Sequence, residues 1–227
     1  MFKKIFTTTM ALCLAWLSVK ADEGMWLPLL LQDNEADMQN LGLQLTAQDI
    51  YDINNSSLKD AVVSLGGFCT AEMVSDQGLL LTNHHCAYGQ IQSHSSVSND
   101  YLTDGFWAMD KSEELENEEL FVSFLVRMED VTERMNTALD SVSDEERSSV
   151  IRMLSAEIVA EATDSTHYNA RVKSFFGGND FYLMVYETFN DVRLVGAPPS
   201  SIGKYGGDTD NWMWPRHTGD FALFRVY

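Results

Sequence analysis

At 227 residues the chain is long enough for one large domain or two small ones, and its hydrophobic content of 45% is that of a soluble globular protein. The formal net charge of -19 argues against binding to the phosphate backbone of nucleic acids, which requires clustered lysine and arginine. A charge of this size favours solubility in an exposed compartment.

Residues 1–21 have the three-part form of a secretory signal. Two lysines precede an apolar stretch from Thr9 to Leu17, and Val19-Lys20-Ala21 places small residues where a signal peptidase cleaves. We therefore expect a mature chain of residues 22–227, exported to the periplasm or the extracellular space, with no membrane span. The alternative interpretation of this stretch is a membrane anchor or a buried strand, although it is short for a span.

The region that follows contains two predicted helix starts and a predicted turn. Thr46 with Asp49, and Ser57 with Asp60, have the spacing of a capping box. The Gly66-Gly67 pair then gives the chain freedom to turn.

A β-hairpin is predicted next. Two apolar runs, Cys69 to Val74 and Leu79 to Leu81, are joined by the turn signal Ser75-Asp76-Gln77-Gly78. The second run leads into Thr82-Asn83-His84-His85-Cys86. A histidine held rigidly beside Cys86 is suited to general-base work, because proton transfer needs donor and acceptor within hydrogen-bond reach.

Cys69 and Cys86 are the cysteines of the expected mature chain, because Cys13 lies in the signal. In an exported protein they most simply form a disulfide that closes the hairpin. The competing interpretation is a metal site formed with His84 and His85. On an extended strand, however, these histidines would point to opposite faces, and the sequence has no CxxC pair or HExxH helix. We expect the disulfide, no metal and no cofactor.

Beyond Cys86, apolar periodicity predicts further regular elements. The expected helices are Ala87–Gln92 and Asp144–Ala162, and the expected strands are Leu120–Met128, Phe181–Phe189, Val192–Val195 and Phe221–Tyr227. The long helix is predicted from apolar residues at helical spacing and from a capping box of Ser143 and Glu146. The acidic run Glu113–Glu119 is expected to be a solvated surface turn.

The block Thr82 to Cys86 resembles the segment that carries the catalytic histidine in chymotrypsin-type serine peptidases. Together with Glu23-Gly24-Met25-Trp26, Ser57 to Ala61 and Asn211 to Asp220, it makes the chain resemble the bacterial dipeptidyl-peptidases of the dipeptidyl-peptidase 7 and 11 type. The resemblance covers almost all of the mature chain. It implies a mostly β fold with inserted helices, namely the first barrel of a chymotrypsin-like double β-barrel.

The resemblance also implies a role for four residues. His85 would be the general base, and Asp220 would be the acid that orients it. Asn211 and Trp212 would bind the free amino terminus of the substrate through an amide oxygen and an aromatic face. Without the resemblance, Asp220 would be interpreted as a strand-capping aspartate and Trp212 as a core residue.

The resemblance requires a serine in a Gly-(Asp or Asn)-Ser-Gly setting, and this motif does not occur in residues 1–227. We therefore interpret residues 22–227 as the N-terminal part of a catalytic domain that lacks its second barrel and nucleophile. The intact enzyme would release dipeptides from the N-terminus of oligopeptides, and the resemblance implies a homodimer. The alternatives are an inactive, secreted, peptidase-like binding module and a metal-dependent hydrolase.

Overall fold

The computed structural model describes residues 26–203 and 219–227, and the chain divides into two units with the boundary between Ala47 and Gln48. In the first unit, the 3₁₀ turn η1 (Pro28–Leu30) leads into helix α2 (Leu31–Asn40). Pro28 is suited to this start because its fixed φ is helical and its missing N–H would have no partner there. The predicted signal segment and the Asn211-Trp212 pair lie outside the described residues.

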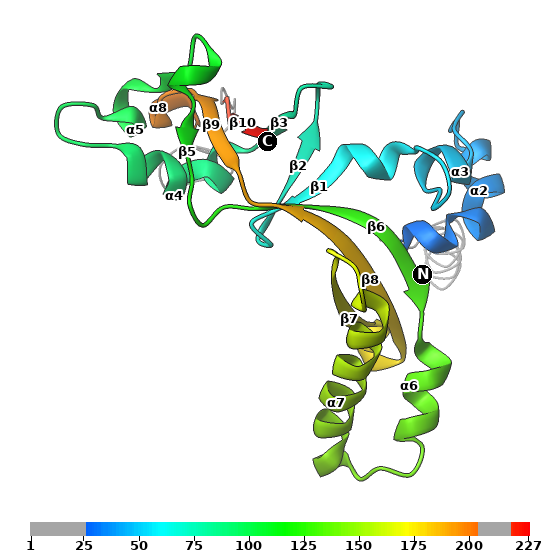
Figure 1. The fold of residues 1–227 in the computed structure, drawn as a ribbon. Helices are drawn as coiled ribbons and strands as arrows, with labels where there is room; N and C mark the ends of the chain where they lie inside the picture. The colour runs from blue at the N-terminus through cyan, green and yellow to red at the C-terminus, as the bar shows by residue number, and fades with distance from the viewer. Residues whose placement is uncertain (1–25, 204–218) are drawn as a thin grey trace, which may run out of the picture. The chain divides into compact units, whose positions relative to one another are not determined.

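The second unit is built on one antiparallel sheet with helices (Figure 1). Its strands follow the order β4-β9-β10-β3-β2-β1-β6-β8-β7, and β5 pairs with β9. The strands are β1 (Val62–Leu65), β2 (Cys69–Met73), β3 (Leu79–Thr82), β4 (Phe106–Trp107), β5 (Leu115–Glu116), β6 (Val122–Asp130), β7 (Asn169–Phe175), β8 (Asp180–Phe189), β9 (Val192–Ala197) and β10 (Ala222–Val226).

Helices precede and separate these strands along the chain. The α-helices are α3 (Ala47–Ile50), α4 (His84–His94), α5 (Tyr101–Asp104), α6 (Thr132–Leu139), α7 (Asp144–Thr163) and α8 (Ser200–Gly203), and the 3₁₀ turns are η2 (Leu58–Ala61), η3 (Lys111–Glu113) and η4 (Phe176–Gly178). The predicted capping box of Ser57 and Asp60 is confirmed, and it opens η2 directly before β1.

The predicted hairpin is confirmed, because β2 and β3 pair antiparallel. Gly78 in its turn has a φ of 75°, and an added Cβ would lie 2.2 Å from the carbonyl oxygen of Val226. Both the left-handed backbone and the close approach of β10 therefore require glycine at this position. The Gly66-Gly67 pair also adopts positive φ and turns β1 into β2.

The first hydrophobic core is enclosed by strands that lie far apart in the sequence. Leu65, Leu80, Val122, Leu194 and Phe224, from five different strands, are fully buried in it. The consecutive strands β5 and β6 pair with β9 and β1 respectively, which are the two ends of the row β1-β2-β3-β10-β9. The apolar side of α4 also packs into this core through Ala87 and Ile91.

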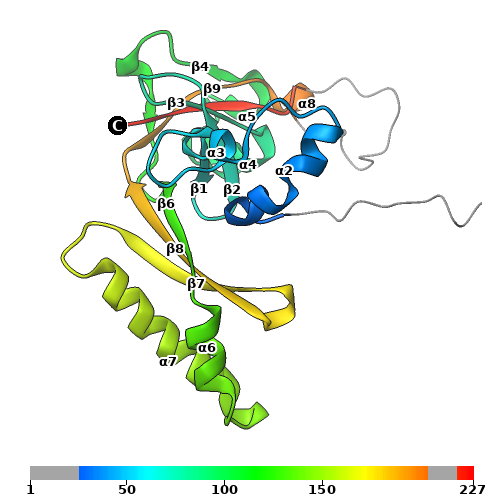
Figure 2. The same cartoon turned by 90° about the vertical axis from the view of Figure 1, so that its right-hand side faces the viewer.

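The second core lies where the hairpin β7–β8 is covered by α6 and α7 (Figure 2). In the described part of the chain, the buried residues of this core all come from these elements: Met135, Leu139, Ile158, Phe181, Leu183 and Val185. The long helix was predicted to within one residue at its C-terminal end. The side chain of Ser143 does not cap it as expected, since its hydroxyl donates to Glu146 Oε2 at 2.9 Å instead of accepting a backbone N–H.

The acidic run Glu113–Glu119 is not wholly solvated, and here the prediction was wrong. The side chain of Glu114 is only 2% exposed. Its carboxylate accepts hydrogen bonds from Arg225 Nε at 2.8 Å and from the Tyr227 hydroxyl at 3.0 Å. A buried carboxylate needs such partners, because its desolvation is otherwise costly.

Candidate active site

The two adjacent histidines lie on the first turn of a helix and not on an extended strand, which corrects the sequence prediction. Helix α4 begins at His84, three residues before the predicted start at Ala87. The carbonyl of Asn83 accepts the first backbone hydrogen bonds, from Cys86 and Ala87, both at 3.2 Å. Neighbouring side chains on a helix are about 100° apart, so the two histidines take different environments without facing opposite sides.

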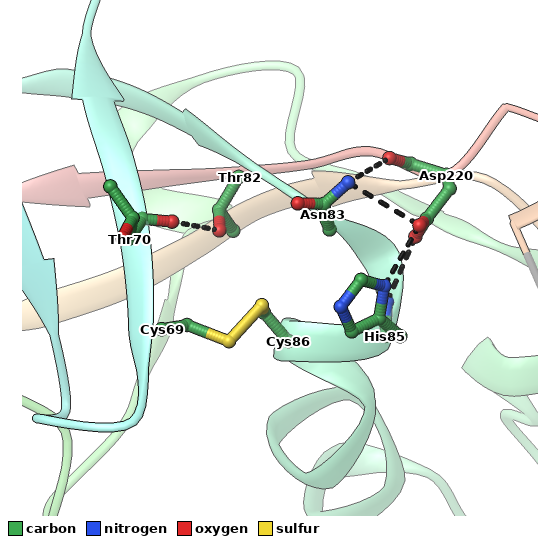
Figure 3. Close-up of a disulfide and its surroundings, with 7 residues drawn as sticks. All are labelled: Cys69, Thr70, Thr82, Asn83, His85, Cys86 and Asp220. Carbon is green, nitrogen blue, oxygen red and sulfur yellow. Dashed lines mark hydrogen bonds and ion pairs between the residues drawn. A yellow bond between two sulfur atoms is a disulfide. The ribbon is translucent and has the colours of Figure 1, made fainter. Parts of the chain in front are cut away.

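The predicted disulfide between Cys69 and Cys86 is present in the structure (Figure 3). It joins β2 to the first turn of α4, with 6.1 Å between the two Cα atoms. Near it, the Thr82 hydroxyl donates to the Thr70 carbonyl at 2.8 Å. The start of α4, and with it the backbone of His85, is therefore tied covalently to the hairpin.

Asp220 lies against His85 and accepts two hydrogen bonds from it (Figure 3). His85 Nδ1 is 2.8 Å from Asp220 Oδ2, and the His85 backbone N–H donates to Oδ1 at 3.1 Å. The Asp220 side chain is 6% exposed, whereas that of His85 is 58% exposed. An ionised carboxylate can only accept hydrogen bonds, so Nδ1 carries the proton of the neutral ring and Nε2 is the basic nitrogen.

Strand pairing explains how two residues 135 positions apart come together. In the register of β3 with β10, Ala222 is opposite Thr82. Asp220 therefore approaches the sheet beside the point where the chain leaves β3 and enters α4. The order of the two residues in the sequence did not show that they lie close together. The pairing of the two predicted strands explains why they do.

Asn83 is a site residue that the sequence analysis did not single out. Its Nδ2 donates to the carbonyl oxygen of Asp220 at 3.1 Å and to Oδ2 at 3.3 Å. Asn83 occupies the N-cap of α4, yet its side chain makes no capping hydrogen bond. The signal that could have drawn attention to Asn83 is its residue type, because asparagine is a strong helix-capping residue and it stands directly after a predicted strand.

His84 has a different environment from its neighbour, since it is 1% exposed. Burial lowers its pKa, while the Asp220 carboxylate and a hydrogen bond with the Pro198 backbone act in the opposite direction. The ring is therefore neutral near pH 7. Among the described residues, no group of three or more histidine, cysteine, aspartate or glutamate side chains is placed to hold a metal ion.

Comparisons with known proteins agree on one family. The family model of peptidase S46 matches residues 21–227. An Asp/Glu-specific dipeptidyl-peptidase of Capnocytophaga gingivalis is 54% identical over 206 residues, which cover 90% of this chain and 29% of that protein. Dipeptidyl-peptidase 7 of the same organism is 50% identical over 230 residues, which cover 100% of this chain and 32% of that protein.

A solved structure gives the same match in three dimensions. The crystal structure of Porphyromonas endodontalis DPP11 in complex with substrate aligns with a TM-score of 0.79 at 50% sequence identity, over 91% of this chain and 31% of that chain. This chain therefore spans less than a third of the length of each of these three relatives. In the described part of the chain, no helix is both long and apolar enough to span a membrane.

Proposed function

Because the chain belongs to the peptidase S46 family, we propose that it supplies the histidine and aspartate of a serine peptidase that releases dipeptides from the N-terminus of oligopeptides. The observation that carries the proposal is the hydrogen bond of an exposed His85 to a nearly buried Asp220. This arrangement gives a histidine with a fixed tautomer and a basic nitrogen on its outer side.

In the proposed reaction the nucleophile is a serine outside residues 1–227. Nε2 of His85 takes the serine proton as the hydroxyl attacks the second peptide bond, and the imidazolium that forms is stabilised by Asp220. The same nitrogen then gives the proton to the leaving amine. The oxyanion would be held by donors from the remainder of the protein.

We propose that the fold is also that of a serine peptidase. Residues 22–227 would form the N-terminal part of the catalytic domain, and the strands around the first core would form the first barrel of a chymotrypsin-like double barrel. The pairing of β5 and β6 with the two ends of the row β1-β2-β3-β10-β9 supports a closed first barrel. The disulfide is consistent with an exported protein whose signal is residues 1–21.

For substrate selection we propose that Asn211 and Trp212 bind the free amino terminus, and on family grounds that the enzyme is a homodimer. A charge-assisted hydrogen bond is worth about 1.5–3 kcal/mol. Asn211→Ala should therefore lower kcat/KM by about 10- to 150-fold on free peptides. Equal cleavage of free and N-acetylated peptides by the wild type would contradict this anchor.

The test of the whole proposal uses the longer protein that contains this chain and the proposed serine, here called the whole enzyme. We expect it to release dipeptides, to keep its activity in chelator and to lose it to a serine-directed fluorophosphonate. Activity lost to the chelator would favour a metal-dependent hydrolase. Absence of both hydrolysis and fluorophosphonate labelling would favour an inactive binding module.

A further inference from the structure

The buried His84 contacts a segment that leads to Asp220. His84 itself has no role in the proposed reaction. The Pro198 backbone lies near the ring and favours its protonated form. Its Nε2 lies 3.5 Å from the Ser200 hydroxyl, at the outer limit of a hydrogen bond. Both contacts are made with the end of β9 and the start of α8.

Gly203, at the end of α8, lies directly on the His84 ring. An added Cβ at this position would be 2.4 Å from Cδ2 and 2.6 Å from Cγ of the histidine. These distances are below any that side-chain carbon atoms adopt, so the ring or α8 would have to move. Glycine is therefore needed here for the close approach of α8 to the histidine.

The same short helix holds the backbone in front of Asp220. The carbonyl of Ile202 accepts a hydrogen bond from the Gly219 N–H at 2.8 Å. Gly219 is followed at once by Asp220, whose carboxylate contacts His85. A continuous path of contacts thus runs from His84 through α8 to Gly219, Asp220 and back to the neighbouring His85.

We propose that His84 is a positioning residue, which holds α8 in place and through it keeps Asp220 within hydrogen-bond distance of His85; this inference rests on the proposed function. A neutral imidazole has one donor and one acceptor nitrogen, and the Ser200 hydroxyl beside Nε2 can serve either role. A leucine would fill the space without the cost of burying a polar ring, so packing alone does not explain a histidine here.

The experiment compares His84→Leu and His84→Gln in the whole enzyme, since the two residues are close in size and only glutamine keeps a donor and an acceptor. A misplacement of about 1 Å in a catalytic group can cost about 10²-fold in rate. We expect His84→Leu to lower kcat by about that factor with KM nearly unchanged, and His84→Gln to recover part of kcat. Equal kcat in both variants and the wild type would overturn the proposal.

A second arm disturbs the same contact from the other side. Gly203→Ala should lower kcat in the wild type but have little further effect in a His84→Ala background, where the ring is gone. The matched control is Gly89→Ala, because Gly89 lies on α4 with nothing within 4 Å of an added Cβ. If Gly203→Ala behaves like Gly89→Ala, the contact has no positioning role.

A spectroscopic arm separates this inference from the proposed function. The His85 Nδ1–H bonded to Asp220 should give a downfield proton resonance in protein labelled with ¹⁵N-histidine, assigned by its absence in His85→Ala. We expect the resonance to be lost or broadened in His84→Leu and retained in His84→Gln, whether or not the wild type cleaves peptides. An unchanged resonance in His84→Leu would overturn the positioning role, whereas a wild type without hydrolysis would overturn only the proposed function.

Discussion

The two hydrophobic cores of residues 48–227 are built from the sequence in different ways. The first combines strands from Val62 to Val226, and it brings His85 and Asp220 together across 135 positions. The second is closed locally by α6, α7 and the hairpin β7–β8, with β6 and β8 continuing between the two cores (Figure 1). Among the described residues, the candidate chemistry lies where distant segments converge, since such convergence can fix a histidine and a carboxylate from separate elements.

The ion pairs of the two regions differ in burial. In the first region the ion pair of Arg225 and Glu114 is nearly buried, and the Glu114 carboxylate accepts a second hydrogen bond from the Tyr227 hydroxyl. In the second region Arg134 bridges Glu157 and Glu161 on the exposed surface between α6 and α7. Removing one partner of a buried pair leaves an uncompensated charge, whereas exposed pairs contribute little. The first region should therefore be the more sensitive of the two to single polar substitutions.

The largest expected effect is on kcat, and we expect it for a substitution in the first region and not for one in the second. In the whole enzyme, His85→Ala should lower kcat on the order of 10⁴-fold or more, because the triad acts as a unit. Glu157→Gln in the second region should leave kcat unchanged. Steady-state kinetics on one peptide checks both. An active His85→Ala enzyme would show that the base lies elsewhere.

Core truncation should give the next largest effect, and here the regions should look alike in stability. Phe224→Ala and Phe181→Ala each remove a fully buried ring, one from each core, and should each cost about 3–5 kcal/mol. Only Phe224→Ala should also reduce the activity per folded molecule, because β10 pairs with β3 beside His85 and Asp220. Denaturant unfolding and kinetics under native conditions measure the two quantities. Equal loss of activity in both variants would mean that the cores are coupled.

The disulfide comes third and belongs to the first region alone. Replacing Cys69 and Cys86 by serine should cost about 3 kcal/mol in the chain-entropy model, since the bridge spans 17 positions. It should also lower kcat, because the first turn of α4 loses its tie to β2. Intact-mass analysis with and without reductant gives the redox state. Two alkylatable thiols in unreduced, exported protein would contradict the bridge.

The same contrast explains what could be predicted from the sequence. The hairpin, the disulfide pair and the long helix follow from local patterns, and they were found. Glu114 was misassigned because its partner Arg225 is 111 positions away. Strand β7 (Asn169–Phe175) was missed because it has no buried residue to mark a face. The early start of α4 was missed because His84 and His85 were assigned to an extended strand, although Asn83 directly before them is a strong capping residue type.

The smallest expected effect is a difference in pH dependence between the regions. Burial lowers the pKa of His84 below its ordinary value of about 6.5, so the unfolded chain binds more protons than the folded one below that pH. Stability from this residue should therefore fall as the pH drops below about 6.5. In the second region, hydrogen bonding to Arg134 lowers the pKa of the exposed Glu161, whose contribution is lost only below its ordinary value of about 4.5.

Between pH 6.5 and 5 the two regions should thus respond differently to substitution. The Asp220 carboxylate near His84 favours the charged ring and His85 disfavours it, so the net direction rests on burial, the largest of the causes. Denaturation midpoints across this window should fall less steeply for His84→Leu than for the wild type, and Glu161→Gln should keep the wild-type slope. Equal slopes in all three proteins would mean that His84 is protonated to the same extent in the folded and unfolded states. Burial would then not lower the pKa of His84.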